Sequence, residues 1–170
     1  MKYLYNFLFI FFILIISTNI SKSNEKTAFV DIDYIIQNSN IGKKMITDIN
    51  KLDKKNLDKL KKKNKILEEL ELSIKKKKNV ITEEAFNKEV VFFKQKLQEF
   101  TKEKNLIVNE FNDYKKKELA NIFKQISPII NEYMEENSVN ILFDSKNIFM
   151  GTKELNLTED ILKKINKELK

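Results

Sequence analysis

The sequence contains no histidine, cysteine, arginine or tryptophan. Without histidine and cysteine, the chain lacks the commonest general base, the thiol nucleophile and the usual zinc ligands, and it cannot form disulfides. Without arginine, it lacks the residue that most often makes bidentate contacts with phosphate and guanine. These absences argue against His- or Cys-based enzyme chemistry, a zinc finger and sequence-specific nucleic-acid recognition.

Glycine and proline are scarce, with two Gly and one Pro in 170 residues. So few helix breakers permit long uninterrupted helices and argue against a turn-rich β fold. Charged residues make up 34% of the chain, but the apolar residues recur at regular intervals, which disordered segments do not show. The length is enough for one domain.

The first 23 residues have the pattern of a secretory signal peptide. Lys2 precedes an apolar run over residues 3–16, and Ser21-Lys22-Ser23 provides a small-x-small exit. The run is shorter than the ~20 residues that span a bilayer comfortably. We therefore predict export and cleavage after Ser23. Cleavage removes two lysines and no acid, which lowers the net charge from +7 to +5.

The longest regular pattern runs from Phe86 to Tyr114. Steps of four and three residues alternate there, and eight of the nine positions are apolar. The nine are Phe86, Val90, Phe93, Leu97, Phe100, Lys104, Ile107, Phe111 and Tyr114. A 3.5-residue repeat keeps one stripe of a helix against a partner helix, so this stretch predicts a long helix with a packed seam.

A Lys-rich segment over residues 41–78 predicts the partner helix. Its approximate seam consists of Ile49, Leu52, Leu60, Leu67, Leu70 and Ile74. Residues 79–82 form the expected turn, with Thr82 as N-cap of the second helix. An antiparallel hairpin buries both seams most simply. Residues 41–78 hold 14 lysines against six acids, net +8, whereas residues 82–127 hold nine against eight, net +1.

Short β-forming segments flank the hairpin. Residues 28–30 precede it, and residues 139–143 and 148–150 follow it, with a turn at 144–147 between the last two. We expect Pro128 to end or kink the second long helix, or to open a new one.

Caps predict where the shorter helices begin. Asp31 or Asp33 can cap the N-terminus of a brief helix over residues 34–37. Ser39 or Asn40 can cap the helix of the first arm, and Asn156 or Thr158 can cap the last helix.

The predicted fold is mainly α with a small β body: a long antiparallel hairpin, a coiled-coil tentacle, flanked by short strands that form an oligomeric β core. The predicted domains are a signal peptide at 1–23, a body at 24–40 and 128–170, and an arm at 41–127 with its tip near 78–83. A sheet of short strands is marginal alone, so we expect the body to self-associate. The residues expected there are Phe29, Val30, Ile141, Phe143, Ile148 and Phe149.

The order and spacing of these segments resemble the family of the periplasmic chaperone Skp, also called OmpH. The matching segments are the leader, the strand at 28–31, the helix entry at 37–43, the charged hairpin, the helix at 128–130, the strand and turn at 139–145 and the closing helix at 157–162. The resemblance implies a homotrimer whose tentacles enclose a cavity. It also implies ATP-independent holding of unfolded outer-membrane proteins in the periplasm, without a cofactor.

Apolar residues outside the seam are the candidate client contacts. Four consecutive residues at 90–93 wrap a full helical turn, so Val91 and Phe92 cannot both lie in a two-helix seam. We hypothesise that Phe92 and apolar residues toward the tip face clients. The tip-ward residues are Ile66, Leu72, Val80 and Ile81. The alternative is a hairpin wide enough to cover them.

The lysines of the first arm and tip are the candidate basic surface. They are Lys61, Lys62, Lys63, Lys75, Lys76, Lys77 and Lys78. They form either a solvated face or a field that attracts acidic clients and anionic lipid or lipopolysaccharide, an effect that salt screens. Export, interleaved acids and missing arginine argue against nucleic acid. An anionic-polymer binder would show a steep salt dependence.

Paired carboxylates do not predict a catalytic or metal site. Neighbouring residues on a helix diverge by ~100°, so pairs such as Glu83/Glu84 and Glu135/Glu136 cannot converge on one atom. We predict caps or surface positions for them, and no enzyme activity. The alternative function is a structural one, a membrane-anchored coiled-coil spacer that keeps its apolar leader.

Overall fold

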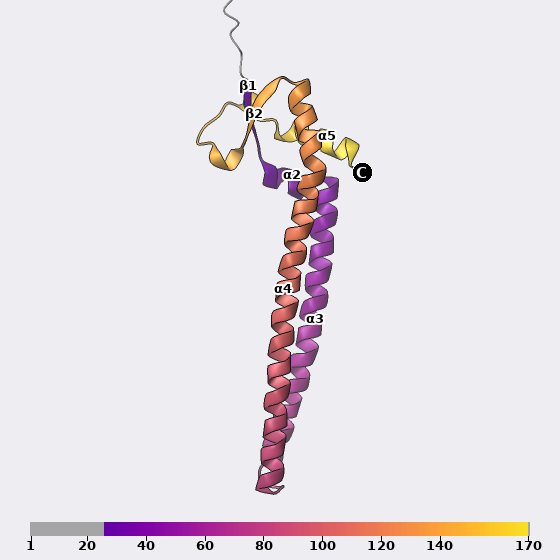
Figure 1. Ribbon diagram of the computed structural model, residues 1–170, viewed down its shortest axis with the longest axis vertical. Helices are drawn as coiled ribbons and strands as arrows, with labels where there is room; N and C mark the ends of the chain where they lie inside the picture. The colour runs from indigo at the N-terminus through magenta and orange to yellow at the C-terminus, as the bar shows by residue number, and fades with distance from the viewer. Residues whose placement is uncertain (1–25, 170) are drawn as a thin grey trace, which may run out of the picture.

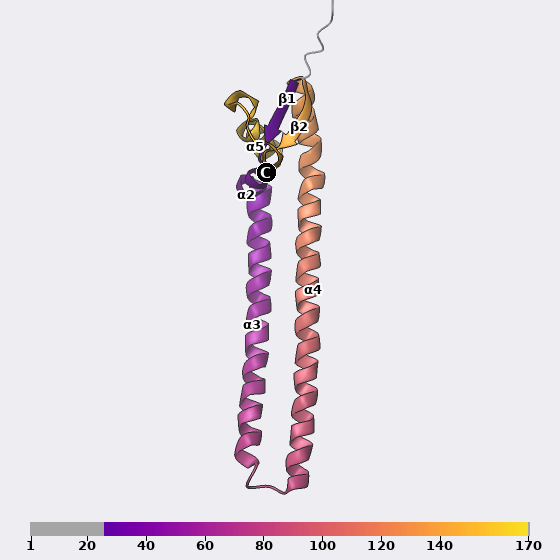
Figure 2. The same ribbon diagram turned by 90° about the vertical axis from the view of Figure 1, so that its left-hand side faces the viewer.

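The computed structural model describes residues 26–169, which form a long helical hairpin attached to a small body (Figure 1). Helix α3 (Asn40–Lys77) descends and helix α4 (Glu83–Glu136) returns beside it, antiparallel, as Figure 2 shows. The predicted fold class is therefore confirmed within one chain. The leader predicted at residues 1–23 lies outside the described residues.

Side-chain caps set where the long helices begin. The Ser39 hydroxyl accepts a hydrogen bond from the Gly42 N–H at 3.2 Å, and the Thr82 hydroxyl accepts one from the Ala85 N–H at 3.3 Å. At the tip, the N–H groups of Val80 and Ile81 donate to the Lys77 carbonyl, which closes the end of α3. Of the two caps proposed for the first arm, Ser39 is the one used.

The body is built on a two-stranded parallel sheet of β1 (Lys26–Val30) and β2 (Val139–Asp144). Parallel strands need a long crossover connection, and here the hairpin supplies it. Helix α5 (Thr158–Glu168) packs against α4, and helix α2 (Ile32–Asn38) packs against α5 and α3.

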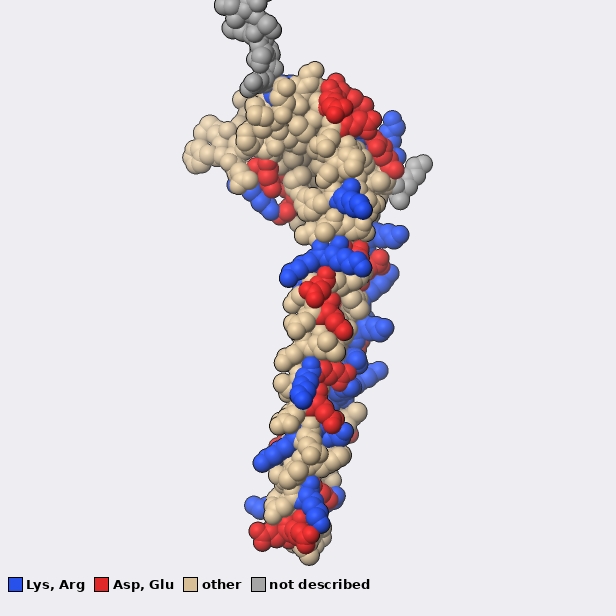
Figure 3. Space-filling view, viewed as in Figure 1, with Lys and Arg blue, Asp and Glu red and all other residues tan. Residues whose placement is uncertain are grey.

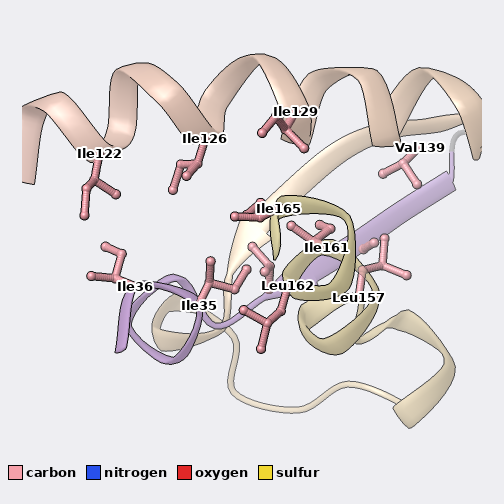
Figure 4. Close-up of a cluster of buried hydrophobic side chains, with 12 residues drawn as sticks. Ile35, Ile36, Ile122, Ile126, Ile129, Val139, Leu157, Ile161, Leu162 and Ile165 are labelled. Atoms are coloured by element: carbon pink, nitrogen blue, oxygen red, sulfur yellow. The ribbon is translucent and has the colours of Figure 1, made fainter. Parts of the chain in front are cut away.

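Aliphatic side chains from these elements meet in one core (Figure 4). Its innermost members are Ile35, Ile126, Ile161, Ile165 and Val30.

Hydrogen bonds join the two ends of the chain in the body. The Asp31 side chain caps α2 by accepting from the Tyr34 N–H at 2.9 Å, and the Asp31 N–H donates to the Thr158 hydroxyl at 2.9 Å. The Asn156 side chain accepts from the Thr158 N–H at 3.1 Å. Asp31, rather than Asp33, therefore caps α2. Leu157 occupies the N-cap position of α5 and makes no side-chain cap hydrogen bond, so neither Asn156 nor Thr158 is the N-cap there.

The corner between α2 and α3 requires a glycine. A Cβ at Gly42 would stand 1.6 Å from the Ile36 carbonyl oxygen. The backbone of α3 can approach the end of α2 this closely only because Gly42 has no side chain. The corner fixes the direction in which the arm leaves the body.

Two sequence predictions are wrong. Residues 148–150 form no strand, because the 3₁₀ turn Ser145–Asn147 carries the chain away from β2 and no neighbouring strand is described for them. Pro128 lies inside α4, so it neither ends this helix nor opens a new one, and a kink at Pro128 stays a prediction. Ile126 and Ile129 on either side of it are buried in the core, while Pro128 itself is exposed, so water can reach the carbonyl that the missing N–H leaves free.

Candidate binding surfaces of the arm and the body

The seam between the arms is narrow. Ile74 on α3 and Ile107 on α4 are buried, and most other members of the two predicted seams are half-buried. Leu97 departs from the pattern, with 45% of its surface exposed. The repeat therefore predicted the packed face of each helix correctly. In a two-helix arm, however, each seam residue is covered only by the one helix opposite it, so its remaining sides stay open to solvent.

Ion pairs fasten the arms along one edge of the seam. Glu103 on α4 accepts from the Lys59 ammonium at 2.9 Å and from Lys63, both on α3. These hydrogen bonds, Lys59 first, lower the pKa of the Glu103 carboxyl below its usual value of 4.5. Nearer the tip, Lys77 and Glu89 pair at 2.8 Å. These pairs bridge the two helices.

The apolar residues proposed to face clients are mostly exposed. Phe92 is 49% exposed and Ile66 63%, and Leu72 and Val80 are exposed as well. A wider hairpin does not cover these four residues. Ile81 is half-buried. Whether any of them contacts a client stays a prediction.

One of these residues, Ile66, lines a small apolar recess in the half of the hairpin nearer the tip. The recess has a volume of about 250 Å³, and its apolar lining is Ile66, Leu67 and Phe100. Lys96 stands at its rim, with its ammonium 5.5 Å from the centre of the Phe92 ring. Phe92, Leu72, Val80 and Ile81 do not line this recess, so the structure does not gather the five proposed residues into one site.

Further exposed apolar residues on the arms were not singled out from the sequence. They are Leu57, Leu97, Leu106, Val108, Leu119 and Phe123. Leu106 and Val108 lie outside the heptad positions, so the reasoning that identified Phe92 could have found them. Leu97 could not be found this way, because it occupies a seam position.

The proposed basic residues divide among three places. Lys63 lines the apolar recess, while Lys62 lines a second hollow of about 710 Å³ nearer the body. At the tip, Lys75 pairs with Glu71 at 2.7 Å. Figure 3 shows lysines along the edge of the shaft that α3 forms, with acids interspersed. The basic character is therefore strongest along α3.

The outer face of the body's sheet is apolar. Phe29 lies opposite Phe143 in the strand register, and Phe143 and Ile141 are both exposed. Phe149 follows in the connecting segment with its whole surface exposed, and Ile148 is half-buried. Val30 points the other way into the chain's own core, so it cannot contribute outward surface.

The carboxylate pairs have structural roles. Asp31 caps α2, Asp33 pairs with Lys146, and Glu136 pairs with Lys164 at 2.6 Å. Within residues 26–169 there is no cluster of three potential metal ligands. In the same residues, every helix is too short or too polar to cross a membrane.

Comparison with known proteins gives one family and one fold. A family model described as "Outer membrane protein (OmpH-like)" matches residues 26–165. A solved structure of a candidate outer membrane chaperone (OmpH-like) from Caulobacter crescentus CB15 superposes with a TM-score of 0.77. The two chains are 12% identical, and the match covers 84% of this chain and 85% of that one. No curated protein matches.

Proposed function

Because the chain belongs to the OmpH-like family of outer membrane proteins, we propose that it is an exported, ATP-independent holdase chaperone. Its clients are unfolded outer-membrane proteins in the periplasm, which it keeps from aggregating before membrane insertion. The observation that carries this proposal is the set of large apolar side chains that the hairpin leaves exposed, Phe92 and Ile66 among them. These side chains are open to solvent, so they are available to contact the apolar segments of an unfolded client.

The shape of the chain supports a cavity between several copies. The arm projects from one end of the body (Figure 2), so copies joined through their bodies would surround a space with their arms. Ile141, Phe143 and Phe149 supply the apolar surface for that association. Residues 148–150 have β-forming sequence but no strand partner within residues 26–169, and they would complete the sheet on assembly. The trimeric number follows from the family resemblance.

The lysines of α3 have a separate proposed role. They attract acidic clients and anionic lipid or lipopolysaccharide headgroups at long range, which speeds capture and is screened by salt. No catalytic step is part of the function, because holding a client requires only a protected surface.

An aggregation assay tests the holdase function. An unfolded outer-membrane β-barrel protein is diluted from denaturant, and light scattering is followed with and without the purified chain, in the absence of ATP. We expect wild type to suppress scattering. The Phe92→Ser variant should require about threefold more protein, because part of one apolar side chain's burial is lost. Tyr34→Ser, an exposed aromatic on the body, is the matched control. A wild-type chain that leaves aggregation unchanged contradicts the proposal.

Native mass spectrometry tests the assembly. We expect three copies, and a shift to monomer in Phe143→Lys, because a charge placed on the apolar sheet face costs desolvation on association. The same spectra report the mature N-terminus. A start near Asn24 supports export, whereas retention of Met1 supports the anchored spacer. A wild-type monomer at micromolar concentration would exclude the shared cavity.

A further inference from the structure

The recess beside Ile66 adjoins the basic hollow nearer the body, and the two meet at an ion pair. Glu103 lines the recess, and its carboxylate binds Lys59, which lines the hollow. Glu110, seven residues beyond Glu103 on α4, also lines the hollow and falls on the same face of the helix. The recess and the hollow are thus neighbours on one edge of the arm.

The hollow is positively charged. Five lysines and two carboxylates line it, which gives a net charge of +3. The lysines are Lys51, Lys54, Lys55, Lys59 and Lys62, and the acids are Asp58 and Glu110. Among the described residues, Lys54, Lys55 and Lys62 form no ion pair. Their ammonium groups can therefore bind an acidic side chain of a partner without first breaking an intramolecular ion pair.

The recess has the opposite character. Ile66, Leu67 and Phe100 form its apolar wall, and Ile66 is 63% exposed even though it lies beside the seam. The two cations at its rim, Lys63 and Lys96, are already paired with Glu103 and Glu99. The recess thus has room for an apolar side chain, and the lysines around it have little charge left to attract an acid.

We propose that this edge of the arm is a two-part client site, which takes a large apolar side chain in the recess and an acidic side chain in the hollow. The inference rests on the proposed holdase function and specifies which client segments are held. The linings of the two parts on α3 are centred about nine residues apart, which is about 14 Å along the helix. An extended chain covers that distance in about four residues. The preferred segment therefore carries its apolar and acidic residues about four positions apart.

Labelled peptides in an anisotropy titration test this spacing with the full chain. One extended peptide carries a Phe pair and an Asp pair four positions apart. A second has the same composition with the two pairs adjacent, and a third replaces Asp with Asn in the spaced arrangement. We expect the spaced peptide to bind at least about fivefold more tightly than the adjacent one, because only it reaches both parts. Equal affinities for the spaced and adjacent peptides overturn the proposal.

Matched variants assign the two parts. Ile66→Ser should weaken the spaced peptide about tenfold, whereas Tyr34→Ser, at an exposed aromatic on the body that lines neither part, should not. The double variant Lys55→Gln/Lys62→Gln should weaken the Asp peptide but leave the Asn peptide unchanged. Lys116→Gln/Lys117→Gln removes the same charge from α4 outside the hollow and should change neither.

The variants at Ile66 and at the lysines alter exposed side chains, so the fold should persist. The preference for the spaced peptide is measured on the wild-type chain and does not depend on any variant. If Tyr34→Ser weakens binding as much as Ile66→Ser, the recess is not the apolar part and the proposal fails. A wild-type chain that suppresses aggregation but shows no spacing preference overturns the two-part site alone. A chain that does not suppress aggregation contradicts the holdase function itself.

Discussion

The body and the arm bury apolar side chains to very different extents. In the body, residues such as Ile126, Ile161 and Ile165 have no exposed surface, because α2, α4, α5 and the sheet surround them. In the described arm, Ile74 and Ile107 are the seam residues that reach burial, and others stay half-exposed. A two-helix arm cannot enclose its side chains. The body therefore supplies most of the stability, and the arm supplies accessible surface.

The two regions also use polar groups differently. In the body, hydrogen bonds link segments far apart in sequence, such as the Asn40 N–H to the Asn166 side chain at 2.7 Å. In the arm, exposed ion pairs such as Lys59–Glu103 link the two helices, and exposed ion pairs contribute little to the free energy of unfolding. We therefore expect the arm to open locally without unfolding the body.

Truncation in the body core should have the largest effect. Ile126→Ala removes a fully buried side chain where several elements meet, and we expect a loss of about 4 kcal/mol in the free energy of unfolding. The same change at Ile107 in the arm should cost about 2 kcal/mol, since the surroundings can collapse or admit water. Urea unfolding followed by circular dichroism measures both. Equal losses would mean that the arm is packed as tightly as the body.

A methyl group at the corner between the two regions should have an intermediate effect. Gly42→Ala places a Cβ against the Ile36 carbonyl, and the backbone must shift, at a cost of about 3 kcal/mol. Gly151→Ala is the matched control, because its nearest neighbour is the ring of Phe29, a side chain that can turn. Thermal unfolding of both variants makes the comparison. A stable Gly42→Ala protein would show that the corner is loose.

The smallest effect should come from the ion pairs of the arm. Because Lys59 and Lys63 lower the pKa of Glu103, its carboxylate stabilises the fold above pH 4.5, and this contribution is lost as the pH falls through the lowered value. Glu103→Gln should therefore melt slightly below wild type at pH 7, and the difference should vanish in acid. Melting curves at several pH values, followed by circular dichroism, measure this. A difference that persists below the lowered pKa would assign the effect to packing instead of charge.

Local rules predicted the features that depend on few residues. The heptad stripe placed the seam, Thr82 and Ser39 capped the helices, and the strands at 28–30 and 139–143 formed. The strand predicted at residues 148–150 did not form, because a β-forming sequence specifies a strand only where a partner strand is available. The exposed state of Leu97 was also beyond the sequence, since a seam position specifies the side of a helix and not how well the other helix covers it.

The sequence by itself determined two long helices, the turn between them and the uneven share of lysine, because helix periodicity and capping act over a few residues. Tertiary structure decided what those rules could not. Because Ile126 and Ile129 pack in the core, α4 continues as a helix past Pro128. The pairing of the arms set Ile66 beside Phe100 and brought the recess next to the basic hollow. Contacts between residues so far apart in sequence depend on how the two arms align, which the pattern of either arm alone does not specify.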